Sequence, residues 1–382
     1  MPIDRGGVAR YVDELVQAID ADLVIVCQAR DEQRYRDLRP QSTVVAGPRA
    51  LVWRAFRLTW EQLALPRLAR RFDVDVVHSP HYTTPIFMAR PRVVTVHDVT
   101  FFTEPHLHRP FKRWFFKMWI RMSVRIADEV ITPSRATANE LERVTGHAAS
   151  EVLVAHHGVD HERFAPPSTE QIDEALSELG LQHPYILFLG TIEPRKNVPS
   201  LIRAHGIIAA QRDDVPSLVL AGARGWETGV ERALAEHPRP DLVRTLGYID
   251  AHHVVPLLGG AIVVAYPSEG EGFGLPVLEA MAAGAVVLTT RRLAIPEVAG
   301  DGAIYSEPEP QDIARALLSL IDSDDARRGV RARALTRAAQ FSWHDSAAAH
   351  VIAYRAAASL VPSNTGPVPL AHLGDERAEN PE

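Results

Sequence analysis

Residues 261–281 read AIVVAYPSEGEGFGLPVLEAM, and the pattern changes twice within this stretch. The first six residues are apolar, which predicts a buried strand, and Pro276 stands where a helix would begin. The loop between them contains Gly272 and Gly274, which let a ligand come close to the backbone. Because a helix start carries about half a positive charge and several free N–H groups, this unit predicts an anion site suited to a diphosphate.

The same alternation of short strands and longer helices runs through most of the chain. Continuous Val-, Ile- and Leu-rich runs are expected of parallel strands covered on both faces, and they occur at 23–27, 74–78, 92–97, 129–132, 152–155, 185–189, 217–221, 243–246, 261–266 and 285–289. Helical patterns such as 134–144 and 198–210 join these runs into βαβ units. The sequence therefore predicts an α/β protein with two doubly wound domains.

The length of 382 residues is too great for one ordinary core, and two consecutive prolines at 166–167 suit a linker. We expect an N-terminal domain at 1–165, a linker at 166–182, a C-terminal domain at 183–342, a C-terminal helix at 343–361 and a disordered tail at 362–382. The glycine pair Gly6-Gly7 lacks the strand that should precede such a loop. We therefore expect the first strand of the N-terminal domain to be missing, with the true start upstream.

The composition excludes several classes of protein. Hydrophobic residues make up 46% and charged residues 23%, as in a globular protein, and the net charge of −7 argues against a nucleic-acid partner. The single cysteine, Cys27, excludes an internal disulfide and a four-cysteine zinc site. No apolar run approaches the roughly 20 residues of a membrane span, and no signal-peptide pattern opens the chain. We expect a cytoplasmic protein that can lie on the inner face of the cell membrane.

Two glutamates flank the helix start predicted at Pro276. Glu271 lies in the glycine loop and Glu279 in the first turn of the helix, eight positions apart. A carboxylate can accept hydrogen bonds from two neighbouring hydroxyls, which a sugar ring and a ribose both present. The alternative is that Glu279 only complements the helix dipole and Glu271 only caps the loop.

A basic pair, Arg195 and Lys196, follows the predicted strand at 185–189 within the sequence Gly-Thr-Ile-Glu-Pro-Arg-Lys-Asn. Ligands of α/β sheets bind beyond the carboxyl ends of the strands, so these two cations could neutralise a diphosphate leaving group. A solvated surface pair is the alternative interpretation.

Together these residues resemble the retaining glycosyltransferases of family 4, also called glycosyl transferases group 1, over nearly the whole chain from Gly6 to about residue 354. The most specific element is the Glu-x7-Glu motif. The resemblance implies the two-domain GT-B fold, with Glu271 on the donor sugar, Glu279 on the nucleotide ribose, and Arg195 and Lys196 on the diphosphate. Many relatives carry a further basic residue where this chain has Thr191.

The resemblance also implies further positions around the donor, namely Phe273, Gly274, Leu275, Gly6 and Gly7. The amides of Gly274 and Leu275 match the phosphate cradle of the family, and Gly6-Gly7 matches a glycine loop that faces the cradle across the cleft. His97, at the end of the predicted strand 92–97, matches a histidine beside the reacting sugar. Without the resemblance, a structural role would be the better interpretation of His97.

The family precedent is retention, in which the leaving phosphate helps to deprotonate the acceptor. An inverting enzyme would need a base on the acceptor side, for which Asp98 is a weak candidate. The pair Asp73 and Asp75 precedes its strand, whereas a metal site should follow one, and the spacing of the His, Cys and Glu residues does not suggest metal ligands. We therefore expect neither a metal nor another cofactor, and a transferase whose donor is a nucleotide diphosphate-sugar.

General similarity to the family favours mannose from GDP-mannose, and a glycan or a lipid-linked glycan as acceptor. Two other functions stay open: a nucleotide-sugar epimerase or hydrolase on the same fold, and an inactive subunit of a glycosyltransferase complex.

The segment 109–125 carries cations at helical spacing, opposite a stripe formed by Phe115, Met118, Trp119 and Met122. A basic, aromatic amphipathic helix can lie in an anionic membrane interface. The alternative is a helix that packs its aromatic residues on the core of the N-terminal domain.

Overall fold

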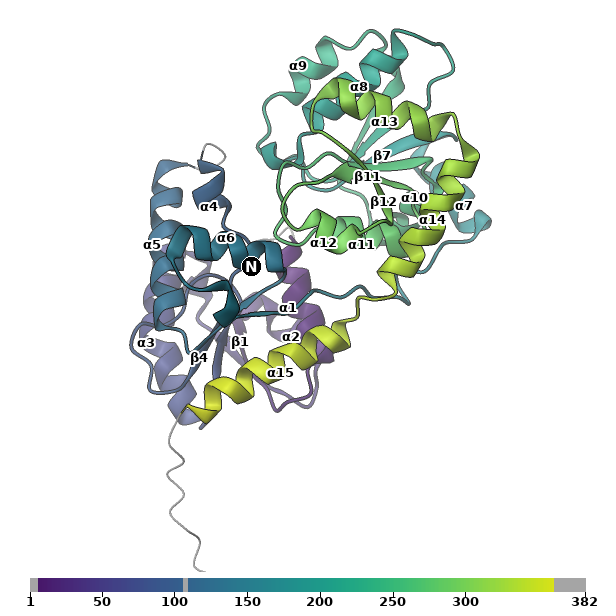
Figure 1. The fold of residues 1–382 in the computed structure, drawn as a ribbon. Coiled ribbons are helices and arrows are strands. Elements are labelled where there is room, and N and C mark those ends of the chain that lie inside the picture. The colour runs from purple at the N-terminus through teal and green to yellow at the C-terminus, as the bar shows by residue number, and fades with distance from the viewer. Residues whose placement is uncertain (1–5, 106–108, 361–382) are drawn as a thin grey trace, which may run out of the picture.

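The computed structural model describes residues 6–105 and 109–360, which form two α/β domains (Figure 1). Each domain contains parallel strands connected by helices, so the predicted α/β fold with two Rossmann-like domains is confirmed. The chain passes from the first domain to the second before α7 and returns after α14.

The C-terminal domain is built on six parallel strands in the order β12-β11-β10-β7-β8-β9. They are β7 (Tyr185–Leu189), β8 (Ser217–Ala221), β9 (Val243–Gly247), β10 (Val263–Tyr266), β11 (Val287–Thr290) and β12 (Ala303–Ser306). The helices around them are α8 (Val198–Ala209), α9 (Val230–Ala235), α10 (Ala251–Gly260), α11 (Leu275–Ala282), α12 (Ile295–Ala299), α13 (Pro310–Ile321) and α14 (Asp324–Ala338). The strand order reverses between β7 and β10, and in open α/β sheets ligands bind at such a reversal, outside the carboxyl ends of the strands.

The N-terminal domain contains a four-stranded parallel sheet in the order β3-β4-β5-β6 and a separate parallel pair, β1-β2. The strands are β1 (Val24–Gln28), β2 (Thr43–Gly47), β3 (Val77–Ser79), β4 (Arg92–Thr95), β5 (Glu129–Thr132) and β6 (Val152–Val154). The helices are α1 (Gly7–Ala18), α2 (Glu32–Leu38), α3 (Arg54–Arg71), α4 (Thr100–Thr103), α5 (Pro110–Ile126) and α6 (Arg135–Thr145). Within the described residues α1 is the first element, and Gly6 is its N-cap.

Two further helices belong to the connections between the domains. Helix α7 (Thr169–Leu179) follows the first connection, and α15 (Trp343–Ser359), yellow in Figure 1, lies along the N-terminal domain. Ala353 and Ala357 of α15 are fully buried in a cluster with residues of β4 and β5. Gly158 permits the return of the chain, because a Cβ at this position would lie 2.1 Å from the backbone nitrogen of Trp343. The last helix thus completes the core of the first domain.

Two observations bear on membranes and metals. Every helix within residues 6–105 and 109–360 falls short of the length and apolarity that a membrane span requires. Asp73 and Asp75 are exposed in the turn before β3, and Asp73 forms an ion pair with Arg90. These two carboxylates therefore form a solvated entry to the strand.

Candidate active site between the two domains

The loop after β10 brings the glycine-rich motif against the N-terminal domain. Gly274 has a φ of 101°, in the left-handed region that favours glycine, and it caps the start of α11. Gly272 is required for a different reason than ligand access: a Cβ there would lie 1.8 Å from the carbonyl oxygen of His97. The Gly272 carbonyl accepts hydrogen bonds from Ser134 Oγ at 2.8 Å and Thr137 Oγ1 at 3.0 Å. Gly272 is therefore one point at which the glycine-rich loop touches the N-terminal domain.

The half-buried Arg195 and the buried Lys196 and Glu271 form one cluster at the carboxyl ends of β7 and β10. The Arg195 guanidinium and Lys196 Nζ each contact one oxygen of the Glu271 carboxylate, and Arg195 Nε also donates to Glu193 Oε2 at 2.9 Å. Burial alone would raise the pKa of Glu271, but the two cations outweigh it and lower that pKa to about 2. Burial lowers the pKa of Lys196, although Glu271 opposes the shift. Glu271 is therefore ionised, and its negative charge is neutralised by Arg195 and Lys196, the two cations predicted to bind a diphosphate.

The second glutamate of the motif is paired across the domain interface. Glu279 of α11 is buried, and Arg10 of α1 donates to its Oε1. The sequence analysis did not identify Arg10, although it lies one helical turn after the Gly6-Gly7 pair and so shares its side of the interface. A cation from the N-terminal domain thus meets the carboxylate predicted to hold the ribose.

Few atoms lie near the two glycines at the start of α1, Gly6 and Gly7. A Cβ at Gly6 would meet nothing within 4 Å, and one at Gly7 would lie 3.9 Å from Leu275 Cδ1. Gly7 therefore faces the start of α11, where the phosphate cradle was predicted. Phe273 is buried, and its ring centroid lies 4.9 Å from that of His157 in the N-terminal domain.

His97 lies just after β4 and is buried. Its Nε2 lies 2.8 Å from the carbonyl oxygen of Pro80, which can only accept, so Nε2 carries the proton. Burial lowers the pKa of His97 and keeps the imidazole neutral. The Tyr11 ring meets the His97 ring edge-on with centroids 4.8 Å apart. The structure thus holds the ring within the N-terminal domain, while the backbone carbonyl of the same residue contacts Gly272.

Asp98, the candidate base, is held by its own loop. Its Oδ1 accepts from the amide of Thr100 at 3.1 Å and from Thr100 Oγ1 at 2.9 Å. Burial lowers the pKa of Arg195 in the other domain, but the charges of Glu271, Glu193 and Asp98 outweigh it and raise that pKa. Asp98 therefore faces the cationic side of the cluster.

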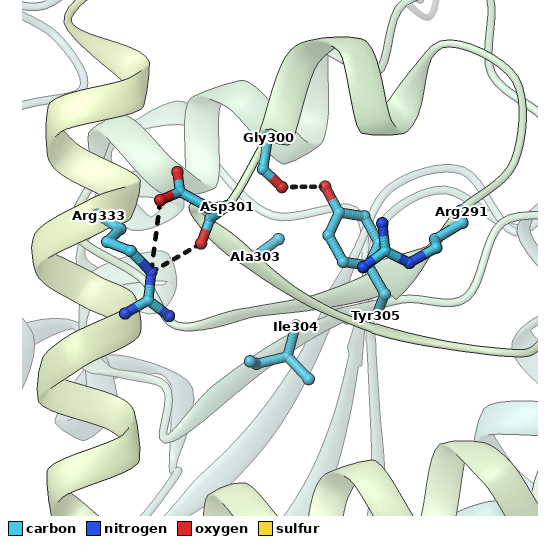
Figure 2. A pocket seen from close by; sticks show the side chains of 7 residues that line it. All are labelled: Arg291, Gly300, Asp301, Ala303, Ile304, Tyr305 and Arg333. Atoms are coloured by element: carbon cyan, nitrogen blue, oxygen red, sulfur yellow. Dashed lines mark hydrogen bonds and ion pairs between the residues drawn. The ribbon is translucent and has the colours of Figure 1, made fainter.

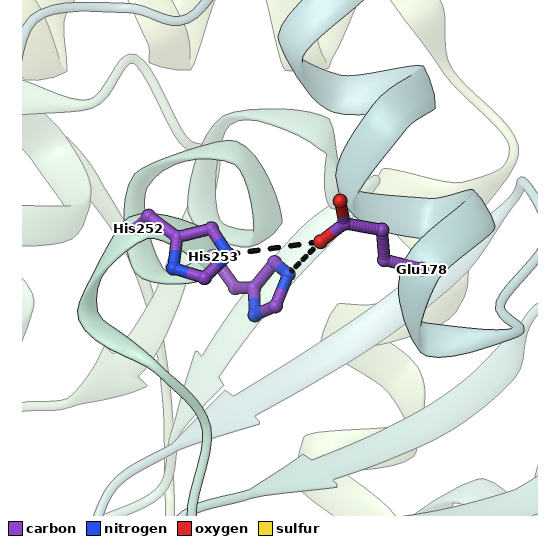
Figure 3. Close-up of side chains that lie close together, drawn as sticks. All are labelled: Glu178, His252 and His253. Atoms are coloured by element: carbon purple, nitrogen blue, oxygen red, sulfur yellow. Dashed lines mark hydrogen bonds and ion pairs between the residues drawn. The ribbon is translucent and has the colours of Figure 1, made fainter.

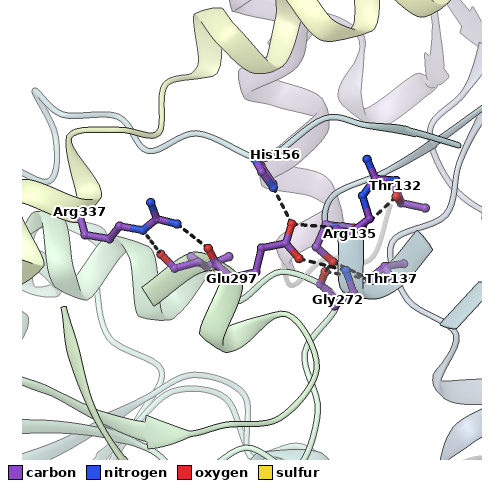
Figure 4. A network of polar contacts seen from close by, with 10 residues as sticks. Thr132, Arg135, Thr137, His156, Gly272, Glu297 and Arg337 are labelled. Carbon is purple, nitrogen blue, oxygen red and sulfur yellow. Dashed lines mark hydrogen bonds and ion pairs between the residues drawn. The ribbon is translucent and has the colours of Figure 1, made fainter. Parts of the chain in front are cut away.

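A network of polar contacts joins the two domains beside this cluster (Figure 4). The Glu297 carboxylate of α12 accepts from the backbone amides of Arg135 and Ala136, at 2.8 and 3.0 Å, at the start of α6. His156 Nε2 lies 2.7 Å from the same carboxylate. Burial alone would raise the pKa of Glu297, but these hydrogen bonds lower it. A carboxylate at a helix N-terminus is favoured by the dipole, so this contact stabilises the observed arrangement of the two domains.

A shallow hollow on the C-terminal domain lies apart from these residues and is lined by Arg291, Gly300, Asp301, Ala303, Ile304, Tyr305 and Arg333 (Figure 2). Arg291 stacks over the Tyr305 ring at 4.2 Å, and Arg333 Nε donates to the carbonyl of Asp301 at 2.9 Å. The hollow therefore lies between side chains that contact one another on the surface of the C-terminal domain.

Comparisons with known proteins identify the family of this chain. The family model described as "Glycosyltransferase Family 4" matches residues 5–163, and the one described as "Glycosyl transferases group 1" matches residues 170–337. The O-antigen chain mannosyltransferase B of Escherichia coli is 31% identical over 289 residues, which cover 75% of each chain. The chain belongs to glycosyltransferase family 4. It is accordingly a glycosyltransferase, for which the family implies a nucleotide-sugar donor and a glycan acceptor.

Two further relatives extend the comparison. The serotype-specific mannosyltransferase WbdA of Escherichia coli is 34% identical over 229 residues, which cover 58% of this chain but only 28% of WbdA. A crystal structure of Anabaena Alr3699/HepE in complex with UDP and glucose has a TM-score of 0.74 at 17% identity and covers 92% of this chain and 96% of that one. At this identity the structural likeness concerns the fold alone, and that fold is GT-B.

Proposed function

We propose that this family 4 glycosyltransferase transfers a hexose with retention of configuration and without a metal ion. The observation that carries the proposal is the convergence of Arg195, Lys196 and Glu271 with the Arg10–Glu279 pair at the strand-order reversal. Three cations and two carboxylates there match the needs of a nucleotide diphosphate-sugar, which presents two phosphate charges and two sets of neighbouring hydroxyls.

The ion pairs of Arg195, Lys196 and Arg10 with the two glutamates imply an exchange of partners when the donor binds. Arg195, Lys196 and the amides at the start of α11 turn to the diphosphate, while Glu271 and Glu279 accept from the sugar and the ribose. The bond between the anomeric carbon and the diphosphate oxygen then breaks, with both electrons passing to the oxygen. The cations and the helix start stabilise that developing charge, so electrostatic stabilisation supplies most of the catalysis.

For a retaining reaction the acceptor oxygen must attack from the face that the diphosphate leaves. Its proton passes to the departing phosphate oxygen, so no protein base is needed on the opposite face. His97, neutral and fixed by its bond to the Pro80 carbonyl, would border the sugar through its position beside Gly272. If Asp98 acted as a base instead, the product would have the inverted configuration.

We propose GDP-mannose as the donor and a glycan or lipid-linked glycan as the acceptor. The support is the names of the relatives, which include the O-antigen chain mannosyltransferase B and the serotype-specific mannosyltransferase WbdA. Anomeric configuration of the product, read by NMR coupling constants, separates retention from inversion.

We further propose that α5 rests on an anionic membrane that carries the acceptor. The predicted apolar stripe was wrong in part, because Trp119 is buried in the domain core. Instead Phe111 and Trp114 expose 76% and 60% of their surface, on the same helix as the cations. Aromatic side chains beside basic ones suit a membrane interface.

The experiment that tests the donor site is thermal stabilisation by GDP-, UDP- and ADP-sugars without added metal, with Glu279→Ala as the control. Ligand at 100 times its Kd should raise the free energy of unfolding by about 2.7 kcal/mol. We expect a shift with GDP-mannose that the variant loses. A shift with UDP-sugars only would overturn the choice of nucleotide, and release of free sugar without acceptor at the full rate would favour a hydrolase.

A further inference from the structure

Two helices of the C-terminal domain bring two histidines and a glutamate together, away from the donor site. Glu178 lies in the last turn of α7, and His252 and His253 lie in the first turn of α10 (Figure 3). His253 Nε2 is 2.6 Å from Glu178 Oε2, and His252 Nε2 is 3.6 Å from the same oxygen. The three donor atoms all lie within 4.8 Å of one another. The sequence analysis saw no such spacing, because Glu178 is separated from the histidines by more than seventy residues.

The separations of these atoms are close to those of a zinc coordination sphere. Zinc binds imidazole nitrogen and carboxylate oxygen at about 2.0–2.2 Å, so neighbouring ligands of a tetrahedral ion lie about 3.3–3.5 Å apart. The observed 2.6 and 3.6 Å bracket that value, so shifts of less than about 1 Å at these two contacts would admit the ion. An imidazole–carboxylate set with three protein ligands leaves a fourth position for water.

The charges on the α7 side of the group favour a cation. A carboxylate at the C-terminal end of a helix faces the negative end of the dipole, and the last turn of α7 contains no basic residue. The first turn of α10 is the positive end of that helix and opposes a cation, so the favourable charge comes from Glu178 and the end of α7. Imidazole nitrogens and a carboxylate oxygen form a ligand set that divalent transition metals accept.

An ordinary hydrogen bond accounts for only part of this arrangement. Glu178 and His253 could pair alone, but His252 also directs its Nε2 at the same oxygen from beyond hydrogen-bond distance, with the two rings 3.8 Å apart. His253 is only 8% exposed, so its ring has a fixed position. The side chains of His252 and Glu178 are 67% and 51% exposed, so an ion can reach the group from solvent.

We propose that Glu178, His252 and His253 bind one Zn²⁺ ion, which joins α7 to α10. Because α7 follows the connection from the N-terminal domain, the ion would fasten the beginning of the C-terminal domain to the helix that precedes β10. This role is structural and is independent of the donor chemistry.

The test is titration of tag-free, chelator-treated protein with Zn²⁺ against a chromophoric competitor, with Glu178→Gln and His252→Ala as variants. Both positions are exposed, so both variants should fold. We expect one tight site per chain, at least tenfold weaker in each variant, because even loss of an outer-shell partner costs 10- to 100-fold in affinity. His344→Ala is the matched control, since the exposed His344 lies 3.7 Å from a single carboxylate, that of Asp345.

A second readout separates a site from scattered surface binding. Bound Co²⁺ should give the visible d–d absorption of a tetrahedral ion in wild-type protein and in His344→Ala, but not in His252→Ala. Equal Zn²⁺ affinity in wild type and both site variants would overturn the proposal. So would a Glu178→Gln protein that is less stable without metal while its Zn²⁺ affinity is unchanged, which is the result expected of a hydrogen bond alone.

Discussion

Replacing Glu271 with glutamine removes a carboxylate that Arg195 and Lys196 both contact. A free nucleotide diphosphate must displace that carboxylate before it can use the two cations. A hydrogen bond to a charged group contributes roughly 1.5–3 kcal/mol. If binding of GDP costs one such contact in the wild type, Glu271→Gln should bind GDP about 10- to 150-fold more tightly. Sugar transfer should fall sharply in the same variant, because the hydroxyls of the donor sugar lose the carboxylate to which they would donate hydrogen bonds.

The assay is isothermal titration with GDP, beside steady-state transfer from the sugar donor. Glu193→Gln is the matched control: Glu193 also pairs with Arg195, but through Nε rather than the nitrogen that contacts Glu271. We expect its GDP affinity to stay near the wild-type value. Unchanged or weaker GDP binding in Glu271→Gln would refute the reasoning that Glu271 competes with the diphosphate.

The same ion pairs predict an acid transition. The pKa of Glu271 is lowered to about 2, so its contribution to stability is complete above the ordinary glutamate pKa and is lost as the pH falls through about 2. The size of that contribution is on the order of 3 kcal/mol. The stability difference between wild type and Glu271→Gln, from urea unfolding at pH 6 and pH 3, should therefore narrow at the lower pH. A stability difference between the two proteins that is larger at pH 3 than at pH 6 would contradict the lowered pKa of Glu271.

Three further predictions concern the domain interface and α5. Gly272→Ala places a methyl group against the His97 carbonyl, so we expect destabilisation of about 1–3 kcal/mol by thermal unfolding and at least tenfold slower transfer; wild-type turnover would show that the loop moves freely. Glu297→Ala removes the carboxylate from the start of α6, so the molecule should be more open in small-angle scattering while GDP affinity is kept, and an unchanged profile would argue against this contact. Lys112→Glu with Lys117→Glu should abolish pelleting with anionic liposomes, and equal pelleting of both proteins would exclude α5 as the membrane contact.

Local patterns of apolar residues were sufficient to predict much of the secondary structure. The runs at 185–189 and 217–221 became β7 and β8 without change, because a continuous apolar run of this length suits a parallel strand that is covered on both faces. The run at 74–78 appears as β3 (Val77–Ser79), shorter and later, because the turn at Asp73 takes up its beginning. Strand order could not be read in the same way, since nothing within a strand specifies its neighbour.

For the candidate site as well, some features could be predicted from the sequence and others only from the tertiary structure. The sequence by itself determined the glycine loop, the helix start at α11, the spacing of Glu271 and Glu279, and the basic pair after β7, because each depends on residues close together in the chain. Only the tertiary structure decided that Arg10 meets Glu279 and that Gly272 lies against the His97 carbonyl. These partners are more than 170 residues apart, and their contact depends on how two separately folded domains face each other, which no local spacing encodes.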